Sequence, residues 1–175
     1  MNIGDLLIPF SLPAASGKEV SSYDYAEKFV FVVFVTCNHC PYSQAYWDRL
    51  IKLAEKFEED NFGLVALCGN DAKKYPQDSF ENMVELYRQK RLPFEYLHDE
   101  DQAILKHLGA TRTPEVFLFN QHRELVYKGA IDDSWENQET VTRVYLEDAV
   151  EYSLDGIEVD YPEIPAVGCS IKWKD

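Results

Sequence analysis

The sequence predicts an α/β fold in which helices cover both faces of a mixed central β-sheet. Three observations indicate this class. An apolar run at 29–35, FVFVVFV, predicts a strand buried on both faces. A helical pattern follows over about 40–59, and a second apolar run at 62–68 predicts another strand. When a helix joins two strands, the strands pair in parallel and the connection is a right-handed crossover. We expect one domain over 1–156, with 157–175 as a tail that packs on it rather than a second domain.

Two further helices are expected before Pro114. Asp78 can cap a helix that runs through Lys90. A short helix at 101–108 should stop at Gly109, a residue suited to a left-handed cap.

A hairpin and a last helix complete the predicted fold. After Pro114, VFLFN (116–120) reads as a strand, and ELVYK (124–128) predicts the antiparallel strand that returns beside it. The last helix is expected over about 140–154. The hairpin adds antiparallel strands to the parallel pair, so the sheet should be mixed.

The charge of the chain narrows its partners and its location. Among 175 residues, 31 are acidic and 17 are basic, which gives a net charge of −14. This charge repels phosphate backbones and anionic lipid, so we expect neither nucleic-acid nor membrane binding. No apolar stretch is long enough to span a bilayer, and the N-terminus lacks a basic leader region. We therefore expect a cytoplasmic location, where thiols stay reduced.

The motif CNHC, at 37–40, is the candidate catalytic site. Cys37 ends a predicted strand just before a helix, whose free N–H groups and dipole favour a thiolate. We expect the pKa of Cys37 to lie below the usual thiol value of about 8.5, which makes Cys37 the nucleophile. Cys40, one turn further on, should be more buried and less acidic, and should resolve a mixed disulfide. His39 can donate a proton or a hydrogen bond to the sulfur.

The other two cysteines have different expected roles. Cys68 ends a buried strand and reads as a small core residue. Cys169 is either a third redox cysteine or a packed anchor for the tail, together with Ile171 and Trp173, and we favour the anchor. A metal site needs about four ligands close together, so neither a metal nor another cofactor is expected. The pair Asp132–Asp133 reads as a solvated loop or a helix cap.

Several longer segments add a resemblance to a known group of proteins. They are CNHCPY (37–42), NDAKKYPQDSFENM (70–83), LPFEYLHDE (92–100), TPEVFLF (113–119), LVYKGAIDDS (125–134) and GCSIKWK (168–174). Together they resemble the peroxiredoxin-like branch of the thioredoxin-like superfamily, related to the alkyl hydroperoxide reductase/thiol-specific antioxidant family. The resemblance implies a thioredoxin-like fold. It also implies that Pro114 is cis and faces the two cysteines, and that the backbone of Thr113 positions a bound partner.

The chain also departs from the resembled pattern. Peroxiredoxins carry P-x-x-x-T-x-x-C, and these positions fall on Val33, Cys37 and Cys40, so the proline and the threonine are missing. Arg112 is a possible stand-in for the peroxidase arginine. The strand at 29–35 also lacks the buried acid that thioredoxin has.

These observations favour a thiol–disulfide oxidoreductase in which Cys37 attacks and Cys40 resolves. A thiol-dependent hydroperoxide reductase is the first alternative, and a binding or adaptor module without redox turnover is the second. The expected partners are a protein disulfide or hydroperoxide substrate and a thioredoxin- or glutathione-type thiol donor. The sequence sets no oligomeric state.

Overall fold

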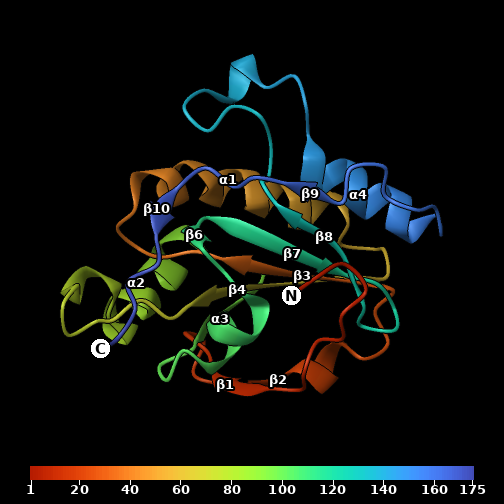
Figure 1. The fold of residues 1–175 in the computed structure, drawn as a ribbon. Coiled ribbons are helices and arrows are strands. Elements are labelled where there is room, and N and C mark those ends of the chain that lie inside the picture. The colour runs from red at the N-terminus through yellow and green to blue at the C-terminus, as the bar shows by residue number, and fades with distance from the viewer.

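A six-stranded mixed β-sheet forms the centre of the protein in the computed structural model, which describes residues 1–175 (Figure 1). Its strand order is β5-β4-β3-β7-β8-β9. The bounds are β3 (Val30–Val35), β4 (Phe62–Cys68), β5 (Glu95–His98), β7 (Glu115–Phe119), β8 (Leu125–Gly129) and β9 (Glu163–Ile164). β3, β4 and β5 are parallel, whereas β7 is antiparallel to both β3 and β8. The predicted mixed sheet is confirmed.

Helices cover both faces of the sheet. α1 (Pro41–Lys56), α2 (Phe80–Lys90) and α4 (Tyr145–Leu154) pack on one core. α3 (Ala103–Leu108) packs on the other core, together with the hairpin of β1 (Ser11–Pro13) and β2 (Glu19–Ser21). Figure 1 shows α1 and α4 on one side of the strands, and α3 and the hairpin on the other.

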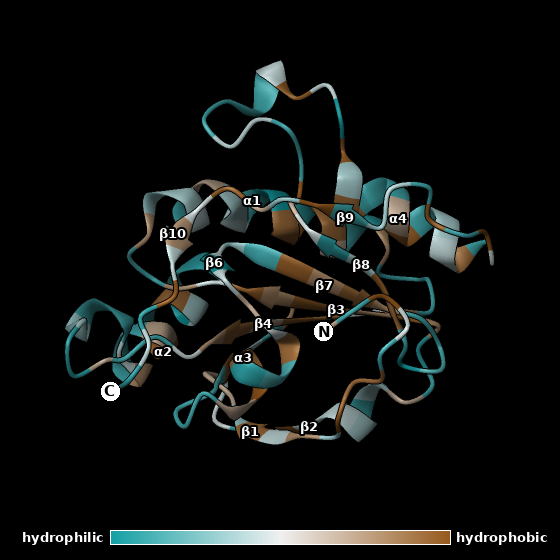
Figure 2. Ribbon diagram, in the orientation of Figure 1, coloured by the Kyte–Doolittle hydropathy of each residue, from teal (hydrophilic) through white to brown (hydrophobic).

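The central strand β3 divides the two cores. Its six residues are all fully buried, and they alternate between the two faces because strand side chains alternate in direction. Val30, Val32 and Phe34 join the core under α1, and Phe31, Val33 and Val35 join the core over α3. Figure 2 shows the strands as the most hydrophobic part of the ribbon. This double burial explains why the sequence of β3 is apolar throughout and does not alternate.

The sequence did not predict the short strands. They are β1, β2, β5, β9, β6 (Arg112–Thr113) and β10 (Cys169–Ser170), each of two to four residues, which is too short to show a period of two. The last helix also begins later than expected, because residues 138–140 form a separate 3-10 turn.

The predicted cap at Asp78 is wrong. The residue that caps α2 is Ser79, whose hydroxyl accepts a hydrogen bond from the Asn82 N–H at 3.2 Å. The Asp78 side chain is fully buried and points elsewhere. At the end of α3, Gly109 adopts the expected left-handed conformation (φ 68°).

The C-terminal tail, residues 157–175, returns across the sheet from α4 toward α2 (Figure 1). It adds β9 beside β8, and β10 pairs antiparallel with β6. Ile171 is 5% exposed and joins the core over α3. The tail thus brings residues near the end of the chain to the edge where α1 begins. None of the helices combines the length and the apolar character that crossing a membrane requires.

Candidate thiol site

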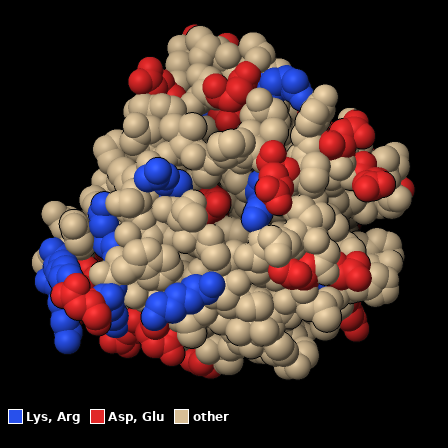
Figure 3. Space-filling model, viewed as in Figure 1, with Lys and Arg blue, Asp and Glu red and all other residues tan.

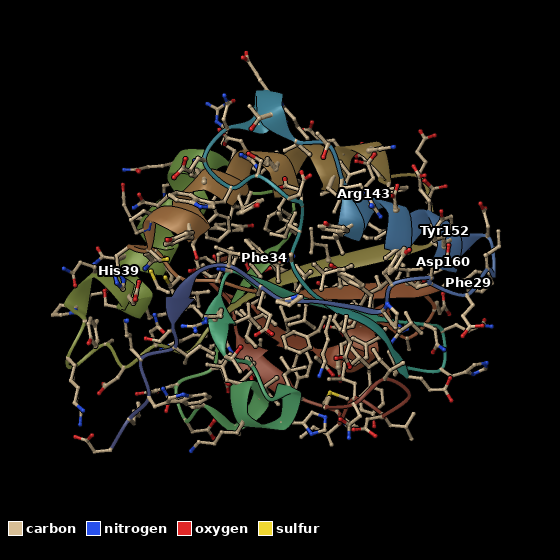
Figure 4. All side chains as sticks on the ribbon, turned by 45° about the horizontal axis from the view of Figure 1, so that its top comes forward. Phe29, Phe34, His39, Arg143, Tyr152 and Asp160 are labelled. Carbon is tan, nitrogen blue, oxygen red and sulfur yellow. The ribbon has the colours of Figure 1, made fainter.

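Cys37 and Cys40 lie in the turn that joins β3 to α1. Cys37 follows the last strand residue, Val35, by two positions, and Cys40 is the N-cap residue of α1. Pro41 occupies the first helical position, where its missing N–H costs nothing. Both cysteine side chains are fully buried. Figure 4 places His39, which lies between them, on the side of the molecule where α1 begins.

Thr113 contacts both sulfurs. Its hydroxyl oxygen lies 3.7 Å from Cys37 Sγ, and its carbonyl oxygen lies 3.3 Å from Cys40 Sγ. The peptide bond between Thr113 and Pro114 is cis, as the resemblance implied. Ser43, in the first turn of α1, lies 3.8 Å from Cys37 Sγ through its hydroxyl.

The tail brings a third thiol to the site. Cys169 pairs across the β6–β10 ladder with Thr113, and its sulfur lies 2.7 Å from Cys40 Sγ. Cys169 is partly exposed, unlike the two cysteines of the motif. Cys169 also packs against the core under α1, and Ile171 is buried in the other core, whereas Trp173 is 39% exposed.

The hydrogen bonds favour the thiolate at Cys40. The thiol of Cys37 is the main cause that lowers the pKa of Cys40. Cys169 and the backbone N–H of Ser43 also lower this pKa, whereas burial raises it. The carbonyl of Thr113 favours the protonated thiol, but these donors outweigh it. The pKa of Cys37 is raised, because Cys37 shares its proton with Cys40, is buried and faces the negative charge of Asp78. These directions run opposite to the expected order, with Cys37 the more acidic, but the two thiols share one proton and titrate as a pair, so the role of each stays a prediction.

Asp78 is the residue of the site that sequence reasoning missed. Its fully buried carboxylate accepts hydrogen bonds from the backbone N–H groups of Asn38 (2.8 Å) and His39 (3.2 Å). The second oxygen accepts from the Asn70 amide at 2.9 Å and lies 2.6 Å from His39 Nδ1. Asp78 thus holds the CNHC turn in place. Its position in the segment 70–83, which carries part of the resemblance, was the available signal.

His39 and Arg112 do not take the positions expected of them. His39 makes no hydrogen bond to either sulfur, and its ring instead stacks on Tyr75 with the ring centroids 5.9 Å apart. Arg112 is exposed, and its side chain makes no hydrogen bond to a cysteine. The structure therefore brings Cys37, Cys40 and Thr113 together with Cys169, and leaves Arg112 at the rim.

A partial metal-binding arrangement exists beside the thiols. The ligating atoms of Cys37, His39 and Asp78 lie within 4.8 Å of one another. A closed zinc site needs four ligands, and here the imidazole is already hydrogen-bonded to the carboxylate. The expectation that the protein uses no metal stays a prediction.

The larger cavities lie away from the thiols. Cavities of about 480 and 600 Å³ are lined by other parts of the chain and contain no cysteine. A smaller cavity, of about 210 Å³, borders the site and is lined by Pro114, Trp135 and Val167 among others. Val167 belongs to the tail, so the tail forms one wall of this cavity and lies beside the site here as well.

Comparisons with known proteins agree with this fold. Residues 3–128 match the model of the AhpC/TSA family, a segment that contains Cys37, Cys40 and Thr113 but not Cys169. An uncharacterized conserved protein from Geobacillus kaustophilus is 35% identical, with 99% of this chain and 93% of that chain covered and a TM-score of 0.93. A hypothetical protein from Sinorhizobium meliloti 1021 is 31% identical, with 99% and 96% covered and a TM-score of 0.93.

A more distant structure shares the fold alone. It is a putative thioredoxin from Neisseria meningitidis, 22% identical, with 86% of this chain and 92% of that chain covered and a TM-score of 0.67. No curated protein matches the chain.

Proposed function

Because the chain belongs to the AhpC/TSA family and has a thioredoxin-like fold, we propose that it is a thiol–disulfide oxidoreductase whose redox pair is Cys37 and Cys40. The observation that carries the proposal is the placement of two buried thiols at the start of α1 against one residue, Thr113, whose hydroxyl oxygen lies 3.7 Å from Cys37 Sγ and whose carbonyl oxygen lies 3.3 Å from Cys40 Sγ. A thiolate beside a second thiol is the arrangement that disulfide exchange requires. The expected cytoplasmic location is retained, since thiols stay reduced there.

The roles of the two cysteines follow from their acidity. The Cys40 thiolate attacks one sulfur of a substrate disulfide, and the other substrate sulfur leaves as a thiolate. The Cys37 thiol then attacks Cys40 Sγ and releases the first substrate sulfur, which takes up the Cys37 proton. The substrate gains two electrons, and the protein is left with a Cys37–Cys40 disulfide. A thioredoxin- or glutathione-type thiol donor restores the pair. This assignment exchanges the roles expected from the sequence alone.

The test is a redox titration of the Cys169→Ser variant, which isolates the pair. The proposal predicts a reversible two-electron couple in which two thiols become resistant to alkylation. Further substitution of Cys37 or Cys40 by Ser should abolish the couple and the reduction of insulin disulfides by dithiothreitol. Cys68→Ala in the same background is the matched control and should retain both. A titration with no couple would support the adaptor module without redox turnover.

One observation favours hydroperoxide reduction as a second candidate. Cys40 falls on the position of the peroxide-attacking cysteine in the resembled pattern, and its pKa is lowered. The Cys40 thiolate would attack the peroxide, forming a sulfenic acid and releasing an alcohol. The Cys37 thiol would then form the disulfide and release water. Consumption of hydroperoxide with a thioredoxin-type reductant, lost in Cys40→Ser, would select this candidate over disulfide reduction.

A further inference from the structure

We propose that Cys169 is a third redox thiol, so that a disulfide moves between the pairs Cys37–Cys40 and Cys40–Cys169. This inference rests on the proposed redox function of the first pair. Cys40 is the central sulfur, because it lies 2.7 Å from Cys169 Sγ, while Cys37 is its partner in the CNHC turn and the main cause of its lowered pKa. The tail then acts as an internal exchange partner of the site, and its role extends beyond packing.

The distance between the sulfurs supports exchange. Cys40 Sγ and Cys169 Sγ are 2.7 Å apart, and a disulfide bond is about 2.05 Å long. A shift of less than 1 Å along this line, about the difference between those lengths, brings the atoms to bonding distance. Both residues are free thiols in this structure. The two sulfurs are therefore neighbours in the folded protein before any exchange.

The tail occupies the edge at which the resemblance placed a bound partner. β10 runs antiparallel to β6, with Cys169 opposite Thr113 and Ser170 opposite Arg112. A peptide substrate would use the same backbone edge of Thr113, as strand addition does in other peptide complexes. The chain thus presents its own cysteine in the place of a substrate cysteine.

Gly168 makes this close approach possible. A Cβ atom at this position would lie 2.2 Å from the Thr113 carbonyl oxygen and 3.1 Å from the Pro114 nitrogen. Both neighbours are backbone atoms, so they cannot yield as a flexible side chain would. Only glycine allows the tail to lie against Thr113 with Cys169 facing the site.

Contacts beyond Cys169 fix the tail. Ile171 is buried, and the carbonyl of Lys172 accepts hydrogen bonds from the Asp71 N–H at 2.8 Å and the Gln102 amide at 3.0 Å. The N–H of Lys172 donates to Asn70 Oδ1 at 3.0 Å. The position of Cys169 is therefore set by packing and hydrogen bonds on its C-terminal side.

Access from solvent distinguishes Cys169 from the other two thiols. Cys37 and Cys40 are fully buried, whereas Cys169 is partly exposed. Burial and the neighbouring Cys40 raise the pKa of Cys169 to about 11, and the positive charges of Lys172 and Arg112 offset only part of this rise. Figure 3 shows Lys and Arg side chains, with Asp and Glu side chains between them, on the side where α2 and the C-terminus lie. Because Cys169 is the partly exposed thiol, it is the one that a small disulfide, such as glutathione disulfide, reaches first.

The exchange balances in three steps. The Cys169 thiol attacks glutathione disulfide and forms a mixed disulfide, and the first glutathione leaves with the Cys169 proton. The Cys40 thiolate attacks Cys169 Sγ, and the second glutathione leaves as a thiolate that takes a proton from water. The Cys37 thiol attacks Cys40 Sγ, and Cys169 leaves and takes the Cys37 proton. Overall, glutathione disulfide is reduced to two thiols, and the pair Cys37–Cys40 is oxidised.

The first test treats folded variants with glutathione disulfide and maps disulfides by mass spectrometry. Cys37→Ser should form an intramolecular Cys40–Cys169 disulfide. Cys169→Ser should form the Cys37–Cys40 disulfide at least about tenfold more slowly than the wild type, because the positioned partner is gone. A Cys37→Ser variant without that disulfide, or wild-type speed in Cys169→Ser, overturns the relay. Absence of any Cys37–Cys40 disulfide in Cys169→Ser instead contradicts the proposed function.

The second test moves the tail without removing a sulfur. Gly168→Ala should slow oxidation of the Cys37–Cys40 pair by glutathione disulfide as much as Cys169→Ser does. Ser170→Ala, on the same strand, is the matched control and should react at the wild-type rate. Circular dichroism confirms that both variants fold. Wild-type speed in Gly168→Ala would contradict the role of the docked tail.

Discussion

The sulfur of Cys40 lies 2.7 Å from the sulfur of Cys169, although 129 positions separate the two residues in the chain. Their contact depends on β10, which folds the tail back over Thr113. The thiol site consequently has a centre, Cys40, with one partner from its own turn and one from the far end of the chain. The proposed thiol–disulfide exchange depends on this arrangement.

The hydrogen bond from Cys37 predicts how the Cys40 thiolate responds to substitution. Because that bond is the main cause of the lowered pKa, Cys37→Ala should raise the pKa of Cys40. Cys37→Ser keeps a donor and should raise it less. The measurement is the ultraviolet absorbance of the thiolate in the reduced protein as the pH falls. The wild-type signal should persist below the usual thiol range, near pH 8.5. Equal titration of both variants and the wild type would contradict the assignment.

Asp78→Asn should destabilise the protein. The amide places an N–H₂ group where one carboxylate oxygen now accepts from Asn70 and contacts His39, so buried partners are left unmatched. The expected loss is about 1–3 kcal/mol in the free energy of unfolding, measured by urea denaturation. Asp48→Asn, at an exposed position of α1, is the control and should change little. Equal stability of the two variants would show that Asp78 does not hold the turn.

The adjacent residues Asp132 and Asp133 should differ sharply. Asp132 forms a buried ion pair with Arg49 at 2.7 Å and also accepts from the Tyr46 hydroxyl at 2.6 Å. The expected solvated loop is therefore wrong for this residue. Asp132→Ala should cost about 3–5 kcal/mol, because it leaves a buried guanidinium without its partner. Asp133→Ala should cost far less, since its carboxylate contacts Thr142 at the surface. Thermal unfolding distinguishes them, and similar melting temperatures would refute the difference.

Ile171→Ala should loosen the tail. Removing a buried isoleucine side chain costs about 2–5 kcal/mol, and here the loss falls on the docking of residues 157–175. The open state of the tail should then be at least about thirtyfold more populated. The rate of Cys40 alkylation by a maleimide reports this opening. Val167→Ala, at a position 57% exposed, is the control. An unchanged alkylation rate in Ile171→Ala would show that the tail is held elsewhere.

Some of the fold could be predicted because its signals are local and repeated. β3 and β4 are apolar throughout, since both faces of each strand are buried. α1 carries a helical period behind Pro41, which starts it. Each of these signals extends over six or more residues, so tertiary contacts do not change the type of element that it predicts.

The centre of the site could not be predicted in the same way. The contact of Cys40 with Cys169 depends on a two-residue strand and on Gly168, and neither shows a periodic pattern. The local sequence suits Asp78 to cap a helix, but its carboxylate instead accepts a hydrogen bond from the backbone of the CNHC turn. The acidity of Cys40 depends on Cys37 of the motif, but also on Ser43 and Cys169, which lie outside the motif.

Disulfide mapping of the wild-type protein tests the central position of Cys40 most directly. The protein is equilibrated in a dithiothreitol buffer that oxidises about half of the molecules, quenched with acid, alkylated and analysed by mass spectrometry. Our account predicts that every intramolecular disulfide contains Cys40, joined in some molecules to Cys37 and in others to Cys169. Disulfides that leave Cys40 as a free thiol would contradict it.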